Sequence, residues 1–257
     1  MPAETHRRST ATRPTKSARW LRALGTRSLP ERIVAAGQTY RLLRIFKHDF
    51  FAATGLYEGL TGAVVLKVGR ETDFLGLPLQ WLGRWLIHRE AAIYSRLLDV
   101  DGVPCFFGTW RQNGFIHAYV PGHPLGRHEW VNDEFFDRLQ SLLEELHRRD
   151  VAYVDLNKRE NIVVGADGRP YLIDFQISLH WPQHRGRKPA PVRWLLALLQ
   201  HADRYHLAKH VKKHRPDLVR SEHERMWQKG VKLARMHRWI SQPFTRLRRR
   251  TLKRLQR

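Results

Sequence analysis

Three short apolar runs, separated by tight polar breaks, stand near the start of the chain and predict an antiparallel meander of strands. β-Branched and aromatic side chains are frequent in these runs, which favours extended structure over helix. The runs cover Tyr40–Phe46, Phe51–Tyr57 and Ala63–Val68.

A longer amphipathic segment follows the meander and predicts a helix. Its apolar positions recur at helical spacing over Leu75–Leu98, with an interruption expected near Gly83. Two more strands are predicted at Cys105–Trp110 and Phe115–Val120, on either side of an Asn-Gly turn. The Pro121-Gly122 pair then breaks the pattern, which predicts a boundary between two lobes.

The clearest helical pattern of the chain lies in its second half. The segment Asp133–Arg149 places Phe and Leu side chains on one face, and Asp133 is expected to cap it. Three short strands and a further helix are expected after it, at Val151–Val154, Ile162–Val164, Tyr171–Ile173 and Val192–Gln200.

The charge of the 257-residue chain is concentrated at its ends. The formal net charge is +22, yet residues 33–184 are close to neutral. Residues 1–32 carry eight basic and two acidic residues, and residues 185–257 carry 22 and four. This distribution excludes a uniformly basic, histone-like chain. It predicts a mobile basic arm at 1–32, two lobes at 33–120 and 121–215, and a basic amphipathic helical tail at 216–257.

Cysteine use and hydropathy exclude two further classes of protein. The single cysteine, Cys105, rules out an internal disulfide framework, and its apolar neighbours predict a buried, inert thiol. No uncharged apolar run reaches about 18 residues, so no membrane-spanning helix is expected. A cytoplasmic location follows as the expectation, with a peripheral position at the inner face of the cytoplasmic membrane as its extension.

Five polar residues occupy positions at which the surrounding sequence pattern suggests a functional role. Lys67 lies inside an apolar strand, where a lysine is costly unless it is used, and Glu90 lies on the following helix. Asp155 and Asn161 share a loop between two short strands, and Asp174 ends an apolar strand. Each is weak evidence alone, but the ordered set is specific.

In this order, and with these elements between them, the five residues resemble the protein-kinase-like superfamily over about 39–179. The resemblance implies an α+β fold with two lobes. The small lobe is an antiparallel sheet with one main helix, and the large lobe is mostly helical. It also implies an ATP-dependent kinase that uses Mg²⁺ to move the γ-phosphate to an acceptor hydroxyl.

The resemblance assigns nucleotide contacts to the small lobe. Lys67 would bind the α- and β-phosphates and be oriented by Glu90, while the adenine would lie against the backbone at Ala118 and Val120. The glycine-rich loop of ordinary protein kinases is missing from the first turn. There Lys47 and turn amides are expected to contact the phosphates instead.

The resemblance assigns the metal and the proton to the large lobe. Asn161 and Asp174 would hold Mg²⁺ through oxygen ligands, and Asp155 would accept the proton of the attacking hydroxyl. Asp155 and Asn161 are one position further apart than in protein kinases. Lys158, between them, is expected to place an additional cation near the transferred phosphate.

Departures from the eukaryotic pattern favour an atypical bacterial branch. Asp174-Phe175-Gln176 lacks the usual glycine, and no Ala-Pro-Glu follows, so a regulated activation segment is not expected. The chain looks like the lipopolysaccharide kinases that phosphorylate Kdo or heptose, and is also similar to RIO-type serine/threonine kinases. The favoured acceptor is a sugar of the lipopolysaccharide inner core, and the alternative is a protein Ser or Thr.

Other interpretations stay open for the same residues. Lys67 and Glu90 form a structural ion pair in one, and in another the chain is a pseudokinase scaffold that binds nucleotide without transfer. His206, His210 and His214 have a spacing that suits a metal, but the surrounding Lys and Arg favour a solvated basic face.

Two segments raise the question of a membrane. The segment Phe74–Ile87 either packs on the small lobe, which is favoured, or touches a membrane through its Trp and Arg side chains. The basic ends favour an anionic membrane surface or a phosphorylated glycolipid over nucleic acid, because Trp227 and Trp239 interleave with the charges and no nucleic-acid-binding motif accompanies them. A basic nucleic-acid-binding protein and a solubilising tail without a partner remain as alternatives.

Overall fold

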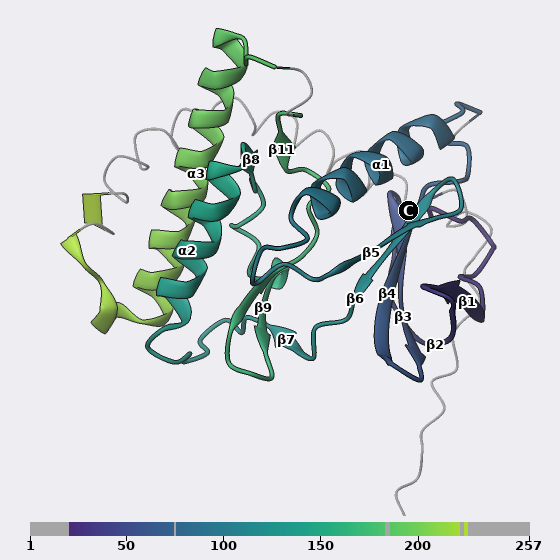
Figure 1. The fold of residues 1–257 in the computed structure, drawn as a ribbon, viewed down its shortest axis with the longest axis horizontal. Helices are drawn as coiled ribbons and strands as arrows, with labels where there is room; N and C mark the ends of the chain where they lie inside the picture. The colour runs from purple at the N-terminus through teal and green to yellow at the C-terminus, as the bar shows by residue number, and fades with distance from the viewer. Residues whose placement is uncertain (1–20, 75, 183–185, 222–223, 226–257) are drawn as a thin grey trace, which may run out of the picture.

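The computed structural model describes residues 21–74, 76–182, 186–221 and 224–225. Figure 1 shows two parts, a curled antiparallel sheet crossed by the helix α1 and a second part dominated by the paired helices α2 and α3. The expected α+β fold with two lobes is confirmed. The sheet part is called the small lobe below, and the helical part the large lobe.

A six-stranded sheet forms the small lobe, with the order β1-β2-β3-β4-β6-β5. Every neighbouring pair in it is antiparallel. The predicted meander and hairpin are confirmed, and the short edge strand β1 is added to them. Because β4 pairs with β6, Lys67 lies opposite Phe115 in the middle of the sheet. The strands are β1 (Arg32–Ala35), β2 (Gln38–His48), β3 (Ala52–Gly59), β4 (Gly62–Gly69), β5 (Phe106–Trp110) and β6 (Gly114–Ala118).

Part of the N-terminal segment packs against this sheet. Ala23, Leu24 and Leu29 are buried in the small-lobe core, and the hydroxyl of Tyr57 donates to the carbonyl oxygen of Pro30 over 2.8 Å. The described residues from 21 onward therefore belong to the fold rather than to a mobile arm. Residues 1–20 of the predicted arm lie outside the described residues, as does most of the predicted tail.

Helix α1 (Gln80–Arg96) is continuous through Gly83, so the predicted interruption is wrong. The glycine serves a close approach instead, because a Cβ there would lie 2.4 Å from the carbonyl oxygen of Arg70. The helix buries Ile87 and Tyr94 but leaves Trp81 and Trp85 more than half exposed. No helix in the described part of the chain is long and apolar enough to cross a bilayer.

The large lobe is built on two long helices and two small antiparallel sheets. Helix α2 buries an apolar face against α3 and the short strands. The predicted cap at Asp133 is wrong: Glu134 occupies the N-cap without a side-chain bond, and Asp133 pairs with Arg215 over 2.6 Å. The elements are β7 (Gly122–Pro124), α2 (Phe135–Arg148), β8 (Val151–Ala152), β9 (Ile162–Gly165), β10 (Pro170–Leu172), β11 (Leu179–His180) and α3 (Ala190–His214), with β10-β9-β7 and β11-β8 forming the sheets.

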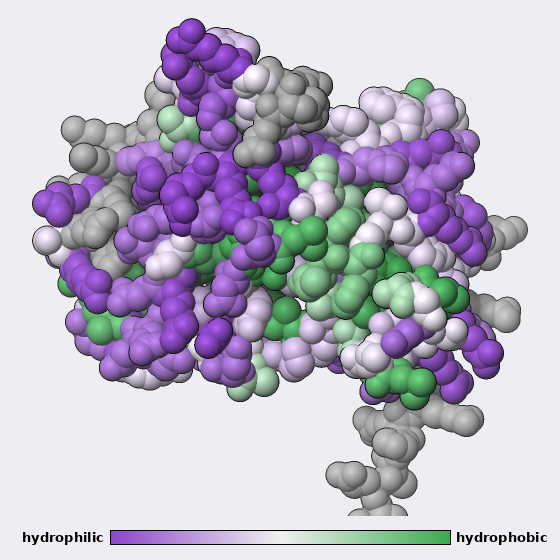
Figure 2. Space-filling model, in the orientation of Figure 1, coloured by the Kyte–Doolittle hydropathy of each residue, from purple (hydrophilic) through white to green (hydrophobic). Residues whose placement is uncertain are grey.

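One hydrophobic cluster joins the two lobes. It contains Tyr94 and Phe115 of the small lobe together with Leu139 and Phe175 of the large lobe. Figure 2 shows hydrophobic residues at the surface between the lobes, over β5 and β6, whereas the helical side of this face is mostly hydrophilic. The shared core fixes the ends of both lobes that face each other, which is where the polar residues gather.

Two predictions about reactive side chains are wrong. Cys105 is exposed rather than buried. His210 and His214 are buried on α3 rather than solvated, because each bonds to a main-chain carbonyl of another segment. The Nε2 of His210 contacts the oxygen of Leu156 over 2.8 Å, and the Nδ1 of His214 contacts that of Glu129 over 3.1 Å. No cluster of three His, Cys, Asp or Glu side chains suited to a metal occurs among the described residues.

The buried His210 makes stability depend on pH. Burial lowers its pKa to about 4, below its ordinary value of 6.5, so between these values the unfolded chain binds a proton that the folded chain does not. Stability therefore falls as the pH falls from 7 to 5, by about 2 kcal/mol for this group. We expect His210→Gln to reduce the difference in urea-unfolding free energy between pH 7 and pH 5 by about that amount.

The matched control is His128→Gln, since His128 is exposed. The substitution should leave the difference between the two pH values unchanged. Equal curves for His210→Gln and the unchanged chain would contradict this account of the buried imidazole.

Candidate functional site

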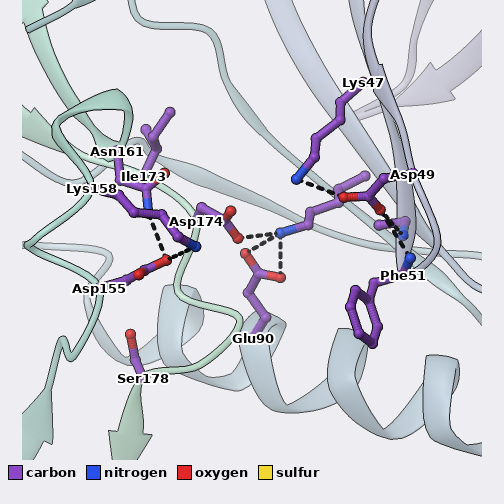
Figure 3. Close-up of polar contacts among 12 residues, drawn as sticks. Lys47, Asp49, Phe51, Glu90, Asp155, Lys158, Asn161, Ile173, Asp174 and Ser178 are labelled. Atoms are coloured by element: carbon purple, nitrogen blue, oxygen red, sulfur yellow. Dashed lines mark hydrogen bonds and ion pairs between the residues drawn. The ribbon is translucent and has the colours of Figure 1, made fainter. Parts of the chain in front are cut away.

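An ion triad connects the two lobes at the end of β4. The Nζ of Lys67 lies 2.8 Å from the carboxylate of Glu90 on α1 and 2.7 Å from Oδ1 of Asp174, which follows β10 (Figure 3). The side chain of Glu90 is 1% exposed, that of Lys67 is 10% exposed and that of Asp174 is 28% exposed. The predicted approach of Glu90 to Lys67 is present, and Asp174 completes it.

The charges of the triad depend on one another. Burial alone lowers the pKa of Lys67, but the carboxylates of Glu90 and Asp174 outweigh burial and raise it, so Lys67 is a cation. Burial raises the pKa of Glu90, and the Lys67 ammonium opposes that rise. Burial also disfavours ionised Asp174, yet the nearby lysines lower its pKa below the ordinary value. The site therefore holds an ionised, partly exposed carboxylate beside a fixed cation.

Asp155 lies in a second cluster on the large lobe. Its Oδ2 accepts from the Nζ of Lys158 over 2.6 Å and from the Nδ2 of Asn161 over 2.9 Å. The unusual spacing of Asp155 and Asn161 is absorbed by a 3₁₀ turn, Arg159–Asn161, which brings the amide back to the carboxylate. The two clusters adjoin, because the main-chain N–H of Ile173 donates to the main-chain carbonyl oxygen of Asn161 over 3.1 Å (Figure 3).

Asp203 on α3 holds the segment before Asp155 in place, and sequence reasoning missed it. Its carboxylate is fully buried and accepts from the N–H of Tyr153 over 2.8 Å and from that of Val154 over 2.7 Å. It also contacts the Nε2 of His147 over 3.1 Å. An Asp within a lysine-rich helix gave no sequence signal, although an acidic residue on an otherwise basic face could have raised the question.

Backbone strain is concentrated at the same place. Val154 has φ of 70°, which is an outlier for a β-branched residue, and Asp174 has φ of 62°. Such conformations persist only where surrounding contacts fix them. The two main-chain hydrogen bonds that Asp203 accepts fix the chain at Val154, and the ion pair with Lys67 restrains Asp174.

Edge-to-face contacts between aromatic rings link α1 to the Asp155 segment. The ring of Phe175 lies 5.0 Å from that of Tyr94 on α1 and 5.1 Å from that of Tyr153. Phe175 directly follows Asp174, so this packing fixes the main chain beside the triad. Ser178 adds a bond from its hydroxyl to the carbonyl oxygen of Tyr153 over 2.8 Å.

The β2–β3 turn carries a lysine in place of glycines. The Nζ of Lys47 lies 2.7 Å from Asp49, whose Oδ1 also accepts from the main-chain N–H groups of Phe51 and Ala52 (Figure 3). The turn is therefore closed by a side chain. Lys47 contributes to the lowered pKa of Asp174, which places it electrostatically within reach of the triad.

The main-chain polar groups between the lobes are only partly engaged in hydrogen bonds within the described protein. The N–H of Ala118 donates to the main-chain carbonyl oxygen of Cys105. The carbonyl oxygen of Ala118 accepts from the Nδ1 of His117 over 2.8 Å. Burial lowers the pKa of His117 to about 4, so its imidazole is neutral. The N–H of Val120 makes no hydrogen bond to any described residue. Val120 can therefore donate to a ligand, while the oxygen of Ala118 is shared with His117.

Oxygen atoms of Asn161 and Asp174 fit a hard divalent cation. The amide nitrogen of Asn161 is used by Asp155, which leaves its oxygen, and Asp174 has a second carboxylate oxygen beyond the one bonded to Lys67. Mg²⁺ is commonly held by one or two such protein ligands together with phosphate oxygens of a substrate. The residues present suit that arrangement.

Comparison with solved structures supports the fold. The chain is similar to Rio2 kinase from Chaetomium thermophilum, solved as an ADP/Mg²⁺-phosphoaspartate complex, with a TM-score of 0.52 and 18% sequence identity. The match covers 69% of this chain and 56% of that one. It establishes a protein-kinase-like fold. No family model matches the sequence, and no curated protein matches it.

The Asp203 carboxylate should be a large contributor to stability. Asp203→Asn replaces one of the two accepting oxygens by an NH₂ group, so the buried N–H of either Tyr153 or Val154 loses its acceptor. We expect a loss of about 2–4 kcal/mol of unfolding free energy in urea. Asp99→Asn is the control, because Asp99 is an exposed partner of Arg149 and its substitution should cost far less than that of Asp203. Equal losses in the two variants would refute the supporting role of Asp203.

Removal of the Lys67 cation should make stability fall with rising pH. In Lys67→Met, Glu90 is buried without its cation, so its folded pKa rises further above the unfolded value. The folded chain then holds a proton that the unfolded chain releases, and stability falls by about 1.4 kcal/mol per pH unit between those two values. Urea unfolding of Lys67→Met and of the unchanged chain from pH 5.5 to pH 8 measures this.

The double variant Lys67→Met/Glu90→Gln isolates the effect, because it removes the titrating carboxyl. Its stability relative to the unchanged chain should lose most of the pH dependence. A pH dependence that persists in the double variant would show that another group is responsible.

Proposed function

We propose that this chain is an ATP- and Mg²⁺-dependent phosphotransferase that moves the γ-phosphate to an acceptor hydroxyl. The observation that carries the proposal is the meeting of the two clusters: Asp155, restrained by Lys158 and Asn161, adjoins the Lys67–Asp174 pair. One cluster supplies a carboxylate that can accept a proton. The other supplies a cation and a metal-binding carboxylate for the phosphates.

These positions support the following reaction. Lys67 would bind phosphate oxygens, with Glu90 keeping it oriented. Asn161 and Asp174 would hold Mg²⁺, and a bound Mg²⁺ would supply positive charge to the phosphates. The acceptor oxygen bonds to the γ-phosphorus, the bond from that phosphorus to the bridging oxygen breaks, and ADP leaves. The proton of the acceptor passes to Asp155.

Two lysines near the triad supply positive charge to the phosphates, in place of the glycine-rich loop of ordinary protein kinases. Lys47 and Lys158 both lower the pKa of Asp174, so both place positive charge near the expected phosphates. Their side chains are 61% and 58% exposed, which leaves each free to adjust when a phosphate binds. In this proposal Lys47 contacts the phosphates, and Lys158 places positive charge near the transferred phosphoryl group.

For the acceptor, we favour a sugar hydroxyl of the lipopolysaccharide inner core over a protein Ser or Thr. The segment after Asp174 reaches α3 at Ala190 and contains only the short strand β11 in its described part, so it offers little extended chain for a peptide. The basic tail would hold the enzyme against an anionic membrane surface at the inner face of the cytoplasmic membrane. A RIO-like protein kinase is compatible with the same fold.

A nucleotide-binding scaffold without transfer is the second candidate. The observation that favours it is the β2–β3 turn, which is closed by Asp49 and has no glycine to let main-chain N–H groups approach a phosphate. The two candidates share nucleotide binding and differ in the use of Asp155.

Calorimetric titration with ADP, with and without Mg²⁺, tests the proposed metal site. The unchanged chain should bind ADP at least about tenfold more tightly with Mg²⁺, and Asp174→Asn should lose that gain. Asp155→Asn should keep it, because Asp155 does not contact the metal in this proposal. Asp217→Asn, at an ion pair with Arg215, is the neutral control. Mg²⁺-independent binding in the unchanged chain would refute the site.

The acceptor class requires a separate experiment. Incubation of the chain with γ-labelled ATP and a cell-envelope extract should place label in the lipid-extractable glycolipid fraction. Label in protein instead would support the RIO-like alternative. No label in either fraction, with Mg·ADP binding intact, would support the scaffold.

A further inference from the structure

A polar cavity lies on the small lobe, away from the triad, and no part of the proposed reaction uses it. It has a volume of about 590 Å³ and is formed where the start of α1 meets the chain after β4 and the β5–β6 turn. In Figure 1 the start of α1 and the β5–β6 turn lie side by side at the upper right. Its charged walls are supplied by Arg27, Arg70, Glu71, Arg84 and Arg111.

The walls of this cavity carry an excess of positive charge. Glu71 is the only acidic residue among the described lining, and it pairs with Arg27 over 2.8 Å. Arg84 and Arg111 form no ion pair with any described carboxylate, and both are exposed. Four guanidinium groups against one carboxylate leave a strongly cationic cavity whose charge is not neutralised by its own walls.

The arginines differ in what they can offer a ligand. Arg70 is 2% exposed and donates to the carbonyl oxygens of Phe50, Thr72 and Asp73, so it fixes the cavity wall. Arg111 lies with its guanidinium 4.4 Å from the centre of the Trp110 ring, which positions it without using its hydrogen-bond donors. Arg84 and Arg111 are therefore the two groups available to a ligand.

The other polar groups of the cavity also favour an anion. The amides of Gln80 and Gln112 line it, and the N-cap of α1 is Leu79, with no side-chain cap and no acidic residue in the first turn. The carboxylate near this helix end is that of Asp73, whose Oδ1 accepts from the Nε2 of Gln80 over 3.4 Å, so the positive helix end adds less to the site than the two arginines do. Paired guanidinium groups bind phosphate through parallel hydrogen bonds, which a simple halide cannot form.

We propose that this cavity binds the phosphate group of a small phosphorylated molecule through Arg84 and Arg111. A concave site suits such a molecule better than a flat bilayer. The binding would clamp α1 to the sheet, since one arginine lies on the helix and the other on the β5–β6 turn. The Nε2 of His88 already links these two elements, by donating to the main-chain carbonyl oxygen of Gln112 over 3.2 Å.

The clamp bears on the triad through α1. Gly83, one position before Arg84, packs against the main chain of Arg70, and Glu90 lies two turns further along the same helix. A ligand that holds the start of α1 favours the helix position in which Glu90 reaches Lys67. This consequence for activity rests on the proposed function, whereas the binding itself does not.

Titration with inorganic phosphate at constant ionic strength tests the site in the full chain. All titrations use the Lys67→Met background, which removes the phosphate-binding lysine of the triad. Arg84→Gln/Arg111→Gln should weaken phosphate binding at least about tenfold. The control Arg187→Gln/Arg193→Gln removes the same charge from exposed positions at and before the start of α3 and should bind phosphate normally.

Hydrogen exchange gives a second readout that does not need activity. Phosphate should slow amide exchange in the first turns of α1, and Arg84→Gln/Arg111→Gln should abolish that protection. Equal binding in both double variants, whether retained or lost together, would overturn the site, because it would show no dependence on the two arginines beyond net charge. Failure of this test leaves Mg·ADP binding unaffected, so it is distinguishable from failure of the proposed function.

Discussion

The Lys67 ammonium between Glu90 and Asp174 is the interaction on which the arrangement of the two lobes depends. It joins the sheet, α1 and the end of β10 at one buried point. Charges removed from water are costly unless their partners are well placed, so α1 must dock closely on the sheet. Gly83 permits that approach. The rings of Tyr94 and Phe175 pack edge to face next to the triad. The triad thus requires a particular packing of both lobes.

The large lobe solves a related problem with a buried carboxylate of its own. Asp203 accepts the main-chain N–H groups of Tyr153 and Val154, which permits the strained conformation that leads into Asp155. The Asp155 carboxylate is in turn fixed by Lys158 and Asn161. A carboxylate positioned in this way needs little reorganisation when an acceptor arrives, which is the main contribution a protein makes to phosphoryl transfer.

The sequence predicted what local pattern and chain order can carry. Lys67 was visible because a lysine is unusual in an apolar strand, and the α+β fold followed from the order of elements around it. Asp203 was not visible, since its partners are main-chain groups about 50 residues away. Local signals misled at Gly83, where close packing overrides a helix-breaking tendency, and at Cys105, where apolar neighbours did not imply burial. They misled again at His210, whose carbonyl partner lies on another segment.

The rate of γ-phosphate transfer or release from Mg·ATP by the purified full chain tests the central claim most directly. The account predicts measurable turnover that falls by about 100-fold or more in Asp155→Asn, because general-base catalysis contributes on that scale, with Mg·ATP affinity unchanged. Turnover that is equal in Asp155→Asn, or absent from a chain that binds Mg·ATP, would contradict the claim that the two clusters together form a phosphotransferase site.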